Sequence, residues 1–397
     1  MKNIKIFIFL SLSILVIACK RDNPEEPKHY TVTVYQSQQV SKTNSLPTYV
    51  HYLPWFGTID YTGYWNHWGS NTNNIKSNGE RDISAVYYPL IDLYDNDDPD
   101  YLEYAFLCMK LCGVDGVFID YYSELSLNDY PFNFTRTIAA MDMADKVGLK
   151  YAVVYEDQVV VAAANSGSYT KLSALTQNFN YLKAHIFNRA NYVKVGGKPL
   201  FMIFGPSSGL TGTQWRSVIQ QDAIFVGYYS DVQSASFQSY VDGTMSWTGA
   251  SSNEATELNQ CQTNSNYNTC IAGAMPGFET VNPGGPYTDP RNGANFSEGL
   301  QNAKTKNPAF LQIPTWNDWQ EGTTIEPSVE YGYTRLQLLQ SFTGVSYTQT
   351  ELELTVQLYQ KRKKYKGKSY ENEVLDQVFY DLLSLHIDEA KQLLSTL

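Results

Sequence analysis

The segment GVFIDYYSELSLNDYPFNFTRTIAAMDMADKVGLKYAVVYED, residues 116–157, contains two strand-like runs on either side of a helical pattern. The two runs are residues 116–122 and 150–155, and both are rich in β-branched and aromatic residues. The helical pattern lies near residues 134–146 and ends at Gly148, a residue favoured at helix C-termini. A strand, a helix and a second strand in this order are typical of a parallel strand pair with a crossover helix.

The same alternation continues along most of the chain. The eight strand-like runs are residues 48–55, 116–122, 150–155, 199–204, 223–229, 243–248, 269–276 and 310–316. Eight parallel strands joined by right-handed crossovers close into a barrel. We therefore predict an α/β fold, a (β/α)8 TIM-type barrel over residues 47–345, with C-terminal helices over residues 346–397 that pack on the barrel.

The N-terminus has the pattern of a lipoprotein leader. An apolar run over residues 6–18 is too short to cross a bilayer comfortably, and it ends with Ala18 before Cys19, which resembles a bacterial lipobox. A transmembrane anchor is the alternative, but charged residues end the apolar run too early for it. We expect a signal peptide over residues 1–18, a lipid on Cys19 and a flexible tether over residues 19–46. This leader predicts a bacterial outer membrane lipoprotein, on either the periplasmic or the cell-surface face.

Composition narrows the possible partners. The net charge of −11 disfavours nucleic acid, and the five histidines include no pair at metal-ligand spacing. We expect no metal, no other cofactor and a monomeric protein. The chain has 31 Tyr and 7 Trp, and side chains with a flat apolar face and a polar edge suit a cleft for polysaccharide or oligosaccharide.

The cysteines after the leader form two pairs. Cys108 and Cys112 are one helical turn apart, a poor geometry for a disulfide, and we expect buried thiols. Cys261 and Cys270 flank a polar loop, and the sequence leaves open whether they are bridged.

The densest polar cluster follows the last predicted strand, in PTWNDWQEGTTIEP, residues 314–327. Active sites of these barrels lie at the C-terminal ends of the strands. Glycosidic bond cleavage requires two carboxyl groups, one as acid and one as base or nucleophile, and Asp318 and Glu321 supply such a pair. We expect Trp319 to shield the pair from water, and Asn317 to contact a sugar hydroxyl or to orient Asp318.

Other polar and aromatic residues follow the remaining strands. Acids at strand ends contact a substrate or cap the next helix, and aromatic residues there form a sugar platform or fill the core. The candidates for substrate binding are Tyr52, Trp55, His67, Trp68, Asp120, Tyr121, Glu156, Asp157 and Trp247.

Four motifs resemble glycoside hydrolase families 99 and 71, which are α-glycan-cleaving (β/α)8 barrels. The motifs are YLPWFG with a nearby NHW (52–57 and 66–68), YPLIDLYD leading to Asp98-Pro99 (88–95), GVDGVFID (113–120) and NDWQEGTTIEP (317–327). In the last motif, family 99 has E-W-H-E and family 71 has D-W-G-E, so the D-W-Q-E of this chain places Asp318 and Glu321 in register with the catalytic pairs.

The resemblance implies roles for the pair. It implies that Glu321 is the general acid and Asp318 the general base. Family 99 retains the anomeric configuration, with the first carboxylate proposed to act on the 2-hydroxyl of the substrate, whereas family 71 inverts it. The sequence leaves the stereochemical outcome, the glycan and the choice between endo and exo attack open.

Two other classes of protein are compatible with a lipoprotein leader. A non-catalytic surface glycan-binding lipoprotein would keep the aromatic residues, but it predicts a broken carboxylate pair, and the pair is intact. A structural or adhesion lipoprotein predicts repeats, which the sequence lacks.

Overall fold

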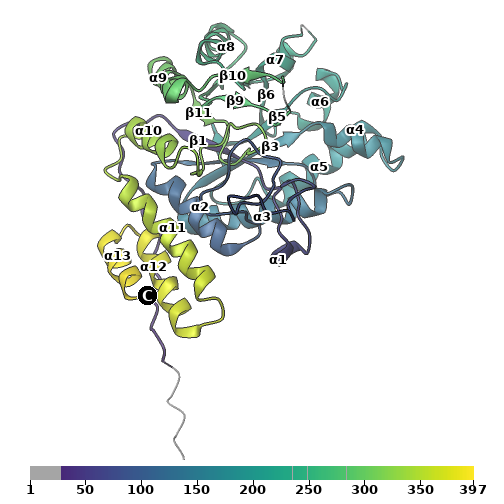
Figure 1. The fold of residues 1–397 in the computed structure, drawn as a ribbon. Coiled ribbons are helices and arrows are strands. Elements are labelled where there is room, and N and C mark those ends of the chain that lie inside the picture. The colour runs from purple at the N-terminus through teal and green to yellow at the C-terminus, as the bar shows by residue number, and fades with distance from the viewer. Residues whose placement is uncertain (1–27, 235, 248, 283) are drawn as a thin grey trace, which may run out of the picture.

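Eight parallel strands form a closed barrel surrounded by helices (Figure 1). The structure is a computed structural model that describes residues 28–234, 236–247, 249–282 and 284–397. The barrel strands are β1 (Thr48–Tyr52), β2 (Gly116–Tyr121), β3 (Lys150–Glu156), β5 (Lys198–Phe204), β6 (Ile224–Tyr228), β7 (Gly243–Met245), β8 (Ile271–Gly273) and β11 (Phe310–Ile313). Their order is β3-β2-β1-β11-β8-β7-β6-β5, and parallel pairing of β3 with β5 closes the ring. The predicted TIM-type barrel is confirmed.

Helices follow most of the strands and cover the barrel from outside (Figure 1). They are α1 (Ile59–Thr62), α2 (Pro99–Leu111), α3 (Tyr130–Val147), α4 (Gln158–Asn165), α5 (Lys171–His185), α6 (Gly212–Ile219), α7 (Tyr229–Val232), α8 (Ser251–Thr263), α9 (Ala294–Lys306) and α10 (Thr334–Thr343). Asp98 caps α2 and accepts a hydrogen bond from the amide of Asp100. A short antiparallel strand, β4 (Lys194–Val195), adds to β5, and β9 (Phe278–Glu279) pairs with β10 (Tyr287–Thr288).

The chain ends in three helices packed beside the barrel: α11 (Gln349–Lys364), α12 (Ser369–Leu383) and α13 (Ile387–Thr396). In Figure 1, α11 and α12 lie next to α2, and α13 packs on α11 and α12. A buried ion pair joins Arg362 of α11 to Glu103 of α2, with nitrogen–oxygen distances of 3.1 and 3.2 Å. The helical extension predicted after residue 346 is therefore part of the folded unit.

The described part of the predicted tether, residues 28–46, has neither helix nor strand but is held along its length. The Tyr30 amide donates to Glu373 of α12 at 2.6 Å, the Gln38 amide to the carbonyl of Leu383 at 3.1 Å, and the Asn44 amide to the carbonyl of Thr343 at 3.0 Å. These residues follow the C-terminal helices before entering β1. Residues 1–27, which include the predicted signal peptide and Cys19, lie outside the described residues. A flexible tether therefore stays a prediction for residues 19–27.

Three further features complete the fold. Cys261 and Cys270 form a disulfide that closes the loop after α8, and Cys108 and Cys112 are buried free thiols as expected. Among residues 28–397 as described, no helix is long and apolar enough to cross a membrane.

Candidate active site

The mouth of the barrel is marked by side chains that meet across its interior. The His51 ring of β1 lies 4.7 Å from the ring of Trp247, which follows β7, and Phe204 at the end of β5 lies 5.1 Å from Trp247. Tyr228 of β6 stacks on Phe204 and donates its hydroxyl to the carbonyl of Trp247 at 3.1 Å. Because β1 and β7 are separated by two strands in the sheet, the contact between His51 and Trp247 crosses the inside of the barrel. Trp247 is therefore at the mouth, and its contact with substrate stays a prediction.

Asp318 and Glu321 lie in the loop after β11, which folds back on itself. The Asp318 amide donates to the hydroxyl of Thr315 at 2.8 Å, and the Glu321 amide donates to Oδ1 of Asp318 at 3.1 Å. Asp318 is 5% exposed. Burial, followed by the negative charge of Glu321, raises the pKa of Asp318 to about 8, and burial also raises the pKa of Glu321. With a pKa of about 8, the Asp318 carboxyl holds a proton at neutral pH.

A second pair of acids, Asp120 of β2 and Glu156 of β3, lies in the same mouth. Burial raises the pKa of Asp120 to about 7, against the opposing effect of the nearby side chains of Tyr122 and Glu156. Burial, followed by the charge of Asp120, raises the pKa of Glu156 well above its ordinary value. The charge of Asp120 also raises the pKa of Asp318, which places the two acidic pairs within electrostatic reach of each other.

His51 is a site residue that the sequence analysis did not select. Its Nε2 lies 4.0 Å from Oδ1 of Asp120, and its Nδ1 has no hydrogen-bond partner among the described residues. Burial lowers the pKa of His51 to about 3, so the imidazole is neutral at physiological pH. A neutral imidazole beside Asp120 can donate one hydrogen bond to a substrate hydroxyl or accept one from it.

An aromatic rim extends from the mouth along the loop after β1. The rings of Trp55 and His67 stack with centroids 4.7 Å apart, and Tyr122 lies 6.5 Å from Trp55. His67 Nε2 lies 3.3 Å from Asp129, and that hydrogen bond lowers the pKa of the Asp129 carboxyl. The Gln320 side chain donates to the carbonyl of His67 at 2.7 Å, which joins the rim to the loop of Asp318 and Glu321. The structure thus brings Trp55 and His67 together, and their role in substrate binding stays a prediction.

Three predicted aromatic contacts are wrong, because these side chains lie in the core. Tyr52 points out of the barrel, where its hydroxyl accepts from Asn96 at 2.7 Å. Trp68 is 1% exposed and donates its ring nitrogen to the carbonyl of Tyr94 at 3.1 Å. Tyr121 is fully buried and donates to Glu124 at 3.0 Å, whereas its neighbour Tyr122 reaches Asp120 in the mouth.

Two predicted polar residues, Asn317 and Asp157, are bound to other parts of the protein. The Asn317 amide accepts from the backbone amide of Leu53 and donates to its carbonyl, both at 2.9 Å, so it ties the loop of Asp318 and Glu321 to the end of β1. These bonds leave the side chain no free group for a sugar hydroxyl, whereas its alternative role, orienting Asp318, stays a prediction. Asp157 accepts from the amides of Ser207 and Ser208, at 2.6 and 2.8 Å, and from the hydroxyl of Ser207 at 2.8 Å. Its carboxylate is completely buried and braces the loop after β5.

Trp319 lies behind the carboxylate pair rather than beside it. Its ring nitrogen donates to the hydroxyl of Tyr94 at 2.8 Å, and Tyr94 in turn donates to Glu326 at 2.7 Å. All three side chains are buried, and burial raises the pKa of Glu326 well above its usual range. Trp319 therefore packs the back of the loop, and its predicted role as a shield is indirect.

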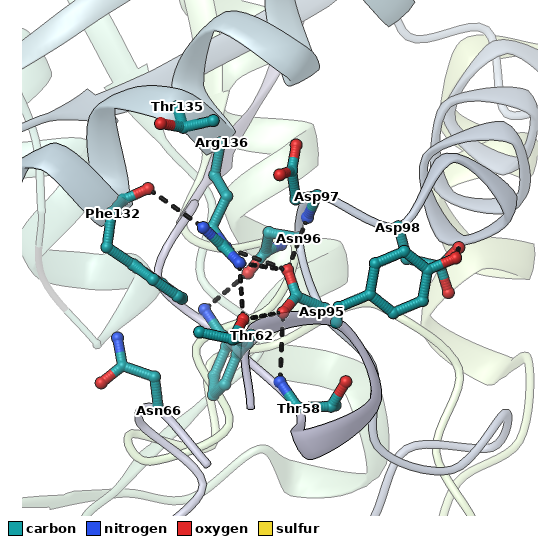
Figure 2. Close-up of polar contacts among 12 residues, drawn as sticks. Thr58, Thr62, Asn66, Asp95, Asn96, Asp97, Asp98, Phe132, Thr135 and Arg136 are labelled. Atoms are coloured by element: carbon teal, nitrogen blue, oxygen red, sulfur yellow. Dashed lines mark hydrogen bonds and ion pairs between the residues drawn. The ribbon is translucent and has the colours of Figure 1, made fainter. Parts of the chain in front are cut away.

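A buried ion pair fixes the loop that carries the aromatic rim (Figure 2). Nε and Nη2 of Arg136, on α3, donate to Oδ1 of Asp95 at 3.0 and 2.7 Å. The other oxygen of Asp95 accepts from the Thr58 amide at 3.1 Å and from the Thr62 hydroxyl. The side chain of Asn96 accepts from the Phe56 amide at 2.6 Å. Asp95 and Asn96 thus hold the loop after β1 in place.

Among the described residues, no group of three or more His, Cys, Asp and Glu side chains is arranged to hold a metal ion. The mouth instead contains two acidic pairs, a neutral imidazole and aromatic faces.

Comparison with known proteins shows that the fold is similar to that of solved glycoside hydrolase structures. A family model described as a domain of unknown function, DUF5010, matches residues 224–357, and no curated protein matches the chain. The GH99 endo-α-mannosidase from Bacteroides thetaiotaomicron, in complex with BIS-TRIS-propane, is 19% identical with a TM-score of 0.59, covering 76% of this chain and 97% of that one. A second structure of a GH99 endo-α-mannosidase from the same organism has 18% identity and a TM-score of 0.59, covering 80% and 98%. A glycoside hydrolase-like protein has 14% identity and a TM-score of 0.53, covering 80% and 98%. At these identities the likeness is one of fold, and this chain has a GH99-like barrel.

Proposed function

We propose that the protein is a glycoside hydrolase that cleaves an α-linked polysaccharide, an α-mannan or an α-glucan, with Asp318 and Glu321 as the catalytic carboxyl groups. The observation that carries this proposal is the pair itself. Two acids three residues apart lie at the mouth of a barrel, and both have a raised pKa. The GH99-like fold supports the same reaction class.

The proposed chemistry needs one proton on the pair. In the inverting form, one carboxylic acid protonates the glycosidic oxygen while the bond from that oxygen to the anomeric carbon breaks. The other carboxylate takes a proton from the water that attacks the anomeric carbon. One water is consumed, and the pair again carries one proton. In the retaining form, the base takes the proton of the sugar's own 2-hydroxyl, and the 2-oxygen bonds to the anomeric carbon while the protonated leaving group departs. Water then attacks the anomeric carbon and opens this ring, with its proton going to Glu321 and a proton returning from Asp318 to the 2-oxygen, so Glu321 serves first as acid and then as base.

Two assignments of the roles are supported by different observations. The resemblance to families 99 and 71 makes Glu321 the acid and Asp318 the base. The deeper burial of Asp318 favours the proton on Asp318 when no substrate is bound. If Glu321 is the acid, substrate binding has to move the proton from Asp318 to Glu321.

The remaining mouth residues have supporting roles in this proposal. Trp55, His67 and Trp247 offer faces on which pyranose rings stack, and His51, Asp120 and Glu156 offer hydrogen-bonding groups to hydroxyls. We also propose that the protein is exported and anchored to the outer membrane by a lipid on Cys19, and that it acts as a monomer without a cofactor.

The test is hydrolysis of α-mannans and α-1,3-glucans by the purified protein beside the Glu321→Gln and Asp318→Asn variants. We expect each variant to lose roughly 10²–10⁴-fold in kcat on polysaccharide. An aryl glycoside with a good leaving group separates the roles, because it does not need protonation: the variant without the acid keeps activity on it and the variant without the base does not. Binding of these glycans with no release of sugar by the wild-type protein would favour the non-catalytic glycan-binding alternative.

A further inference from the structure

A cavity of about 520 Å³ opens on the outer rim of the barrel, between the loop after β1, residues 91–98 and helix α11. Its volume is in the range of pockets that hold small ligands. Because α2 begins at residue 99, just after this loop, the cavity lies at the same end of the barrel as the catalytic carboxyls. The loop after β1 is shared: Trp55 and His67 belong to the mouth, whereas Tyr61 and Trp65 line the cavity.

Aromatic side chains form one wall of this cavity. Tyr61 is 43% exposed, and α1, on which it lies, has no buried residue, so core packing does not account for an aromatic residue here. Trp65 is partly exposed, and the guanidinium of Arg81 lies 4.8 Å from its ring centroid. Tyr359 of α11 continues the wall.

Fixed polar groups form the floor. Asp98 is 2% exposed, and its carboxylate accepts from the Tyr61 hydroxyl at 2.7 Å and from the ammonium of Lys363. Lys363 also donates to Asp100 at 2.8 Å. These contacts hold the Tyr61 ring in one orientation before any ligand arrives, which lowers the entropic cost of binding.

The charges that line the cavity favour a neutral ligand. Asp95 is paired with Arg136 and Asp98 with Lys363. The other charged lining residues are Asp60, Asp92, Arg81 and Lys366, two of each sign. A pocket with balanced charges, aromatic faces and many hydrogen-bonding groups suits a chain of neutral sugars better than a phosphate or an acidic peptide.

We propose that this rim cavity is a second glycan-binding site, which holds a neutral segment of the polysaccharide away from the bond that is cleaved. The C-terminal extension then has a functional part, because α11 supplies Tyr359, Gln360 and Lys363 to the site. As a site for the enzyme's own polymer, the inference rests on the proposed function; as a glycan-binding site, it does not.

Affinity electrophoresis through gels that contain α-mannan or α-1,3-glucan tests the site, in the Glu321→Gln background so that the polymer is not cut. We expect Tyr61→Ala combined with Trp65→Ala to weaken retention about tenfold, the effect of two lost stacking contacts. Tyr64→Ala is the matched control, since Tyr64 is 51% exposed on the same loop and does not line the cavity. Near-ultraviolet circular dichroism checks that each variant is folded, and Tyr61→Ala alone is the milder substitute if the double variant is not.

Kinetics with active protein separate this inference from the proposed function. We expect the Tyr61 and Trp65 substitutions to raise KM for the polymer several-fold without changing kcat, and to leave both constants unchanged for a short oligosaccharide. Retention equal to that of the Tyr64→Ala control, or retention by neither polymer, would overturn the second site. If retention depends on Tyr61 while no polymer is hydrolysed, the site stands and the proposed function fails.

Discussion

Replacing Arg136 by methionine should destabilise the protein through the buried carboxylate of Asp95. Both side chains are almost entirely inaccessible, with 7% of Arg136 and none of Asp95 exposed. Methionine keeps an apolar chain against Phe132, whose ring centroid lies 3.3 Å from the guanidinium carbon, but it removes the positive charge.

The magnitude follows from what remains around Asp95. Breaking a buried ion pair on one side costs about 3–5 kcal/mol, because the other charge is left in a poorly solvated place. Here the carboxylate keeps the amides of Thr58 and Asp97, at 3.1 and 2.8 Å, and the hydroxyl of Thr62. We therefore expect a loss near the lower end, about 3 kcal/mol of unfolding free energy.

Urea unfolding at pH 7, followed by near-ultraviolet circular dichroism, measures this loss. Lys183→Met is the control, because Lys183 and its partner Asp222 are 44% and 40% exposed, and exposed pairs contribute at most about 1 kcal/mol. Adding Asp95→Asn to Arg136→Met removes the unpaired negative charge and should restore part of the unfolding free energy. A loss no larger than that of Lys183→Met would refute the reasoning.

Three other predictions follow from the structure. Because the pKa of Asp318 is raised to about 8 from an ordinary 3.8, the folded protein keeps a proton that the unfolded chain releases, and stability falls as pH rises between these values. In urea unfolding measured at several pH values, the unfolding free energy of Asp318→Asn should fall less with pH than that of the wild type, and at pH 8 it should be about 0.5–2 kcal/mol higher. An equal dependence on pH in both proteins would contradict this prediction. Asp157→Ala should lower the unfolding free energy by about 3 kcal/mol in the same assay, because the amides of Ser207 and Ser208 lose their acceptor. Asp231→Ala, at a half-buried carboxylate, is the comparison. Replacing both Cys261 and Cys270 by alanine should cost about 2–3 kcal/mol for a loop with a sequence separation of 9, and dithiothreitol should lower the stability of the wild type but not of the variant.

The barrel could be predicted because its strands are apolar runs separated by helical patterns. Helices α4 and α8 are among those that the sequence does not predict, and the reasons are opposite. α8 buries only four of its 13 residues, among them Ser251 and Glu254, so it has little apolar periodicity. The sequence of α4, QVVVAAAN, is apolar and β-branched over a short length, a pattern that periodicity does not separate from a strand.

The residues around the site were harder to predict, because their roles depend on contacts between distant segments. Asp157 and Glu156 are neighbours at the end of one strand, and the sequence makes both of them candidates for substrate binding. Only the fold shows that Ser207 and Ser208, about 50 residues later, donate hydrogen bonds to Asp157, while Glu156 lies near Asp120. Similarly, the partner of Asn317 is the backbone of Leu53, from the first strand.

One error was avoidable from the sequence, because the pleat of a strand alternates its side chains between the two faces. If Asp120 faces the barrel interior, Tyr121 faces the helices and Tyr122 faces inward again, so Asp120 and Tyr121 could not both contact the substrate. In β1, where the flanking positions are apolar or aromatic, the buried polar His51 marks the inward face, and Tyr52 must then point outward. In a parallel strand that is buried on both sides, hydrophobicity does not distinguish the faces, but a single polar residue does, since a polar group is retained where a substrate or another polar group can meet it. The same rule adds His51 and Tyr122 to the site and removes Tyr52 and Tyr121.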